Sequence, residues 1–88
     1  MELYETDLRA FLSDLGLAGL APTTIEQYER FQRRWRSEAA HTPTARGVKD
    51  WLATQTPWNA YMAARALRRY VRWYAAEYDT EDWSREIP

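Results

Sequence analysis

The sequence predicts an all-α fold, a compact four-helix bundle in which three helices are longer and the third is short. Two observations carry this prediction. Apolar residues recur at intervals of three and four through most of the 88 residues, which is the spacing of a buried helix face. No segment alternates apolar and polar residues as a half-buried strand does. We expect one core, built largely from the five Trp and six Tyr.

The first helix is predicted to occupy about four turns, and Gly16 and Gly19 are expected to end it. Its predicted apolar face consists of Leu3, Tyr4, Leu8, Phe11, Leu12 and Leu15.

The second helix is expected to begin at Thr23, because Thr23 and Glu26 have the spacing of a capping box. One side of this helix is predicted to be buried, and the opposite side carries basic residues. The buried residues are expected to be Ile25, Tyr28, Phe31, Trp35 and Ala39, and the opposite residues are Gln27, Arg30, Arg33, Arg34 and Ser37.

A turn is expected from Ala40 to Thr44, because Pro43 lacks a backbone donor and disfavours helix in the residue before it. A short third helix follows and is predicted to end near Gln55. Its inward residues are expected to be Val48, Trp51 and Leu52.

The fourth helix is predicted to be the longest, with Thr56 as its N-cap and Pro57 as its first residue. Residues 79–88 show no clear period. We therefore expect a helical domain at 1–78 and an acidic tail or linker at 79–88. The buried side of the fourth helix is predicted to consist of Ala60, Ala64, Leu67, Val71, Tyr74 and Tyr78.

Four arginines of the fourth helix stand at positions i, i+3, i+4 and i+7, which places them on one face. Like charges at these spacings cost a few tenths of a kcal/mol per pair, so the face destabilises its own helix unless an anion neutralises it. No Asp or Glu lies between Trp58 and Ala76. The pattern predicts docking to a polyanion, for which double-stranded DNA is the leading candidate. The four residues, called here the arginine face, are Arg65, Arg68, Arg69 and Arg72.

The net charge of −1 conceals a segregation of charge along the chain. Residues 1–21 hold four acidic groups and one basic group, and residues 77–88 hold five acidic groups and one basic group. The remaining residues, 22–76, hold ten basic and four acidic groups. Because salt screens charges beyond about 8 Å, the acidic ends need not cancel the basic middle.

Several classes of protein are disfavoured. The absence of Cys excludes a disulfide scaffold and thiolate metal sites, and a lone His41 does not make a metal site. No glycine-rich phosphate loop, serine elbow or HExxH pattern is present, so no cofactor and no catalytic residue are expected. No apolar run approaches the ~20 residues that span a bilayer, and the expected location is the cytoplasm.

The order and spacing of several short motifs resemble the core-binding domain of tyrosine recombinases, the SAM-like N-terminal domain of phage integrases. The resemblance covers about residues 3–88. It is carried by residues 21–25 (APTTI), Tyr28, residues 66–70 (ALRRY), Trp73, Tyr74 and the closing Ile87 and Pro88.

This resemblance implies a SAM-like four-helix domain that grips one side of a DNA duplex as half of a C-shaped clamp. The second and fourth helices would face the major groove. In that family the nucleophilic tyrosine and its activating residues belong to a C-terminal catalytic domain, before which this chain ends. The chain alone is expected not to be an enzyme, its parent protein being a site-specific recombinase. The catalytic domain and other protomers on DNA are the further candidate partners.

The expected DNA-binding residues have different roles. Arg65 and Arg69 are the candidates for reading bases, and Thr24 is a candidate phosphate donor near a helix N-terminus. Gln27 lies on the outer face of the second helix, and Lys49 is a candidate flanking contact. The expected phosphate contacts are Arg30, Arg34, Arg68 and Arg72.

Other interpretations stay open at this point. The chain would also suit a stand-alone helical interaction module, whose arginines hold an acidic protein or the acidic tail, or a small DNA-binding regulator. Acidic residues of the first helix or tail would then bridge the arginine face, while Glu26, Glu29 and Glu38 would pair with arginines of the second helix. The tryptophans Trp51, Trp58 and Trp73 are expected in the core or at an interface, with Trp83 packing back on the bundle.

Overall fold

The computed structural model describes residues 3–39 and 43–88, and these form four α-helices and one short 3-10 helix. The elements are α1 (Glu5–Leu17), α2 (Pro22–Ala39), α3 (Ala45–Leu52), α4 (Pro57–Tyr78) and η1 (Ser84–Glu86). No strand occurs in the described parts of the chain, so the predicted all-α fold is confirmed. His41 lies outside the described residues, as does most of the turn expected from Ala40 to Thr44.

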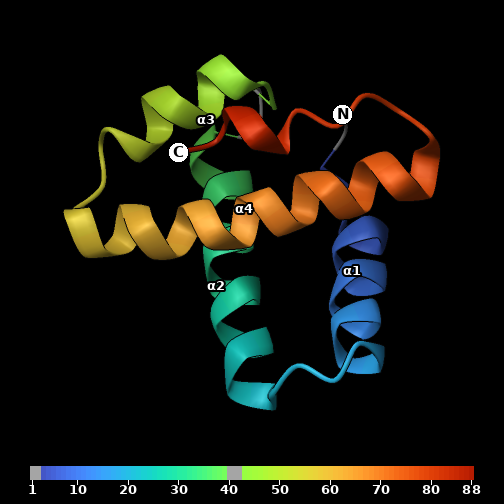
Figure 1. Cartoon of the computed structure of the whole chain (residues 1–88). Coiled ribbons are helices and arrows are strands. Elements are labelled where there is room, and N and C mark those ends of the chain that lie inside the picture. The colour runs from blue at the N-terminus through green and yellow to red at the C-terminus, as the bar shows by residue number, and fades with distance from the viewer. Residues whose placement is uncertain (1–2, 40–42) are drawn as a thin grey trace.

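The helices pack in two crossing layers (Figure 1). The first pair, α1 and α2, lies side by side, joined by a short loop at one end, and α4 crosses both of them. Above α4 in this view lie α3, which also contacts α2, and the C-terminal segment with η1. The core between the layers is built from large side chains with almost no exposure, among them Phe11, Trp35, Leu67 and Tyr70.

Two polar contacts join α1 to α4 beside this core. The indole Nε1 of Trp73 donates to a carboxylate oxygen of Asp14 at 2.7 Å. The hydroxyl of Tyr78 donates to the buried carboxylate of Asp7, and this contact raises the pKa of Tyr78 to about 12. Both contacts fix the angle at which α4 crosses α1, because each joins one particular turn of one helix to one turn of the other.

The start of α2 differs from the prediction. This helix begins at Pro22, and the N–H of Ile25 donates to the carbonyl of Ala21 at 3.1 Å. Thr23 therefore lies inside the first turn, and the predicted capping box is wrong. Proline at the first position has its φ already set and has no N–H to satisfy, so it starts the helix one residue earlier.

The caps of the next two helices follow sequence chemistry more closely. Thr44 Oγ1 accepts from the N–H of Gly47 at 3.1 Å, and Thr56 Oγ1 accepts from the N–H of Asn59 at 3.4 Å. The predicted start of α4 at Pro57 behind Thr56 is confirmed. By contrast, α3 ends at Leu52 rather than near Gln55, because the next residues form tighter turn bonds to Trp51 and Leu52.

The buried side of α4 is wider than predicted, because α1, α2, α3 and η1 all contact this helix. Tyr78 was expected inside but is 50% exposed, and Tyr74 and Ala60 are half-buried. The residues that are buried are Met62, Ala63, Ala64, Ala66, Leu67, Tyr70, Val71 and Ala75.

The C-terminal segment packs against α4. Ile87 is 4% exposed and belongs to the main core, Ser84 is buried, and Trp83 is half-buried against the core as expected. Burial of Ile87 therefore ties the acidic residues around it to the helical domain.

We expect Ile87→Ala to lower the free energy of unfolding by about 2–5 kcal/mol, because it empties a filled core position. Urea denaturation measures this loss, with Glu86→Ala at the neighbouring exposed position as the control. Equal stability of the two variants would contradict the packing of this segment.

A buried amide on α2 produces a second expectation. Gln32 is fully buried, and neither its Oε1 nor its Nε2 has a hydrogen-bond partner among the described residues. Because an unsatisfied buried polar group costs about 1–3 kcal/mol, Gln32→Met should raise the free energy of unfolding by a similar amount. Gln27→Met, the same change at an exposed position of α2, should leave it nearly unchanged. A Gln32→Met protein that unfolds at lower urea than the wild type would refute this expectation.

Candidate nucleic-acid interface

The arginine face of the fourth helix, from here on the α4 arginine face, lies on the side of α4 opposite its buried residues. Arg65, Arg69 and Arg72 are exposed, and Arg68 is half-buried. None of the four forms an ion pair with an Asp or Glu in the part of the chain that the structure describes. The acidic bridges that would neutralise this face from within are therefore absent among those residues.

Three of these arginines have other neighbours. The guanidinium carbon of Arg65 lies 5.8 Å from the centroid of the Tyr61 ring, a cation–π contact. Arg68 donates to the carbonyl oxygen of Pro88. Asp82 has a lowered pKa, chiefly because Ser84 hydrogen-bonds to it, and the positive charge of Arg72 adds to this effect. The tail thus bonds to Arg68 through a backbone carbonyl at one edge of the face, while no carboxylate of the tail forms an ion pair with these arginines.

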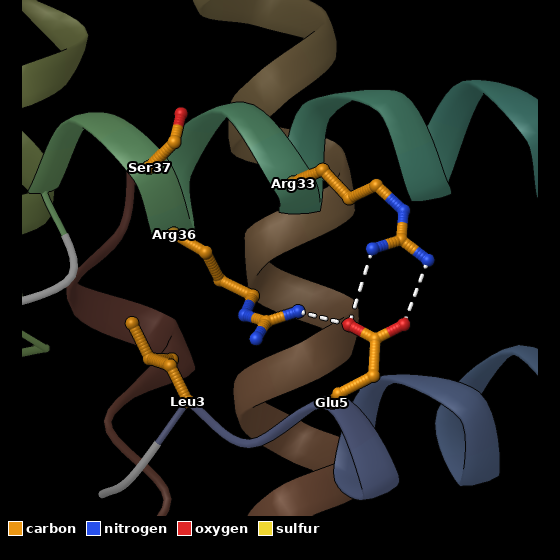
Figure 2. Close-up of a pocket in the computed structure, with 5 residues that line it drawn as sticks. All are labelled: Leu3, Glu5, Arg33, Arg36 and Ser37. Carbon is orange, nitrogen blue, oxygen red and sulfur yellow. Dashed lines mark hydrogen bonds and ion pairs between the residues drawn. The ribbon is translucent and has the colours of Figure 1, made fainter.

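The arginines of α2 are in a different electrostatic state. Arg33 is paired with Glu5 and with Glu29, each at 2.9 Å, and Arg36 reaches Glu5 at 2.6 Å. Figure 2 shows Arg33 and Arg36 converging on the Glu5 carboxylate from neighbouring turns of α2. These contacts neutralise part of the basic face that the sequence placed on the second helix.

The Glu5 cluster, which consists of Glu5, Arg33 and Arg36, lies in a surface groove of about 340 Å³. Leu3 and Ser37 also line this groove. Hydrogen bonds from Arg33 and then from Arg36 lower the pKa of Glu5 to about 2. A carboxylate held by two guanidiniums ties the start of α1 to α2. These ion pairs therefore stabilise the fold, and they leave little unpaired positive charge in the groove for a ligand.

The remaining predicted residues of α2 are dispersed around the helix. Arg34 has two internal partners, the Gln55 amide oxygen at 2.8 Å and the Glu38 carboxylate at 3.6 Å. Arg30 is exposed and forms no ion pair with described residues, Gln27 is exposed, and Thr24 is half-buried.

Arg30 lies on the exposed side of α2. It stands two residues after the buried Tyr28, which places it roughly 200° around the helix from the buried side. Thr24 lies one turn before Tyr28 and therefore on the same side of α2 as that residue. The structure brings the four α4 arginines together, and it does not bring Arg30 to them.

Two exposed aromatic residues of α4, Trp58 and Tyr61, adjoin the face. Trp58 is expected from the sequence in the core or at an interface, and Tyr61 has no role predicted from the sequence. Trp58 is 67% exposed and Tyr61 54% exposed. Their signal in the sequence was their spacing, because positions 58, 61 and 65 continue one stripe of α4. In contrast, Trp51 is buried and bonded to Glu38 through its Nε1, as expected for a core residue.

Other kinds of site find no support in the described residues. No group of three or more His, Cys, Asp or Glu there is placed to hold a metal ion. Lys49, the candidate flanking contact, is half-buried in α3. None of the described helices has the length and apolarity needed to cross a membrane.

The Glu5 cluster predicts a pH dependence of stability. The pKa of Glu5 is lower in the folded chain, at about 2, than its ordinary value of 4.5. The stabilising effect of its charge is therefore full above pH 4.5 and is lost as the pH falls toward 2.

We expect Glu5→Gln to be less stable than the wild type at pH 6 and to approach it near pH 2 to 3, as measured by urea denaturation. Glu26→Gln, at an exposed position of α2, serves as the control. A difference between wild type and Glu5→Gln that is the same at both pH values would contradict the role of the Glu5 charge.

Comparison of the chain with protein-family models, with curated proteins and with solved structures finds no match. A proposal of function therefore rests on the charge and geometry of the α4 face and on the motifs that resemble the recombinase domain.

Proposed function

We propose that this chain binds double-stranded DNA through the α4 arginine face, as the core-binding domain of a site-specific tyrosine recombinase. The single observation that carries the proposal is the presence of four arginines on one side of α4 with no acidic partner among the described residues. The contrast with α2, where Arg33, Arg34 and Arg36 all have acidic partners, supports it.

Electrostatics favours an extended anion over a point charge. Four like charges within two turns of α4 repel one another, and a row of phosphates relieves this repulsion at several positions at once. Release of counterions from the phosphates supplies affinity that does not depend on sequence. The rigid helix presents the guanidiniums with little further loss of entropy on binding.

Within the face, the arginines differ in what they are free to reach. Arg65 and Arg69 are exposed and are proposed to contact base edges, where a guanidinium can bind guanine in bidentate fashion. Arg72, near the acidic tail, and Arg68, bonded to Pro88, are proposed as phosphate contacts that fix register.

Contacts from α2 are proposed to be secondary. Thr24 is half-buried and Gln27 is exposed near the N-terminal end of α2, and both are proposed as additional contacts to the same duplex. Arg34 would first have to leave Glu38 and Gln55, and Arg30 lies on the far side of α2. These two remain weaker candidates than the α4 arginines.

The recombinase part of the proposal comes from the motif resemblance. In this role the chain positions DNA, and strand cleavage is the work of a catalytic domain elsewhere in the parent protein. The alternative is an interaction module that holds an acidic protein. The attraction between Arg72 and Asp82 favours this alternative, because it shows that a carboxylate can lie near this face.

The double variant Arg65→Ala/Arg69→Ala tests the proposal. We expect it to bind a duplex about 10-fold or more weakly, and to reduce the slope of log K against log salt by about two, because two cationic contacts are lost. Fluorescence anisotropy over a range of salt concentrations measures both quantities. The melting temperature should change little, because both side chains are exposed.

The matched control is Arg9→Ala/Arg46→Ala, which removes the same number of charges. Arg9 and Arg46 are exposed but lie on α1 and α3, paired with Glu5 and Asp50. If both double variants weaken DNA binding equally, the α4 face is not the interface. If wild type binds an acidic peptide more tightly than DNA at the same salt, the alternative is favoured.

A further inference from the structure

Trp58 and Tyr61 extend the α4 arginine face toward the N-terminal end of the helix. Their ring centroids lie 6.0 Å apart, and their planes are inclined by 33°. Tyr61 is also in contact with the guanidinium of Arg65, which restricts the motion of its ring. The three side chains form one continuous exposed surface along α4.

This aromatic pair differs from the other large apolar side chains that are exposed in the described residues. Tyr78 is bonded to Asp7 and packs on Tyr74 at 4.6 Å between centroids, while Tyr4 and Leu17 lie at opposite ends of α1. Single exposed apolar residues are normal, whereas contiguous exposed apolar patches mark binding surfaces. Trp58 and Tyr61 together therefore make the strongest candidate for such a surface on α4.

The surrounding charge selects the chemistry of that partner. No Asp or Glu occurs between Asp50 and Glu77, so along α4 the aromatic pair adjoins arginines and no acidic residue. A partner that fits carries negative charge next to flat apolar rings. Aromatic side chains beside arginines are how proteins bind single-stranded nucleic acid, with bases on the rings and phosphates on the cations.

An apolar groove lies beside Tyr61. It has a volume of about 260 Å³ and is lined by Leu52, Ala60, Tyr61, Ala64 and Pro88. Inside a continuous duplex both faces of each base are covered by its stacked neighbours, so such a base cannot lie on Tyr61. An unstacked base can cover a ring face and enter the groove beside it.

We propose that Trp58, Tyr61 and this groove bind unstacked bases of a single-stranded DNA segment that continues from a duplex held by Arg65 and Arg69. The preferred ligand is then a junction between duplex and single strand. This inference rests on the proposed function, because the arginines hold the adjoining phosphates.

The test compares a blunt duplex with the same duplex carrying a short thymidine overhang, on either the 5′ or the 3′ strand, by fluorescence anisotropy at one salt concentration. Wild type should bind one of the two overhang probes about 5- to 30-fold more tightly than the blunt duplex. Trp58→Ala/Tyr61→Ala should remove this preference and leave blunt-duplex affinity unchanged. Circular dichroism and thermal melting check that the variant is folded.

Two further variants separate stacking on this pair from folding defects and from a general effect of exposed aromatic residues. Trp58→Phe/Tyr61→Phe keeps flat rings and should retain most of the overhang preference, even where the alanine variant is destabilised. Tyr4→Ala removes an exposed aromatic residue from another part of the surface and should retain the full preference.

Each contrary outcome is distinct. Equal binding of blunt and overhang probes by wild type overturns the stacking site and leaves duplex binding intact. A preference for the overhang that survives in Trp58→Ala/Tyr61→Ala also overturns it. The same holds if wild type forms a dimer without DNA and this variant does not, because a second copy of the chain would then cover the aromatic pair. Absence of binding to every probe overturns the proposed function and this site with it.

Discussion

The crossing of α4 over α1 and α2 is the constraint on which the rest of this structure depends. The buried side of α4 packs on aromatic and aliphatic residues of both helices, with Phe11 edge-on to Tyr70 at 5.1 Å between ring centroids. Trp73 and Tyr78 add hydrogen bonds to Asp14 and Asp7 on α1. Because these contacts fix the rotation of α4 about its axis, they also fix the outward direction of its arginines. If α4 could rotate about its axis, some of its guanidiniums would become buried or some of its core residues would become exposed.

The same packing separates two basic surfaces that look alike along the chain. On α2 the arginines lie within reach of carboxylates from α1 and from α2 itself, so Glu5 and Glu38 absorb much of their charge. On α4 the outward arginines form no ion pair with a carboxylate among the described residues, although Arg72 attracts Asp82 of the tail. A cation with an internal partner must lose that partner before it binds a ligand, whereas one without a partner gains the full interaction. The proposed ligand-binding role therefore falls to the arginines of α4 rather than to those of α2.

Much of the fold was predictable because it depends on local chemistry. The apolar spacing of the helices, the cap of α4 at Thr56 and Pro57, and the inward residues Val48, Trp51 and Leu52 all follow from positions a few residues apart. Errors arose where local rules competed or where distant segments intervened. Pro22 started α2 ahead of Thr23, and burial on several sides of α4 enclosed Tyr70 while leaving Tyr78 at the surface.

The sequence by itself determined that the chain is helical and that four arginines share one face of its longest helix. Both depend on the 100° step between residues of a helix and need no knowledge of the fold. Only the tertiary structure decided which arginines are neutralised by carboxylates and which exposed side chains adjoin one another on the surface. Glu5 bonds to Arg33, which lies 28 positions away in the sequence, and Ile87 packs in the same core as Leu8. Trp58 remains exposed beside Tyr61. Contacts between distant positions depend on how helices cross, and no periodicity within one helix encodes that crossing.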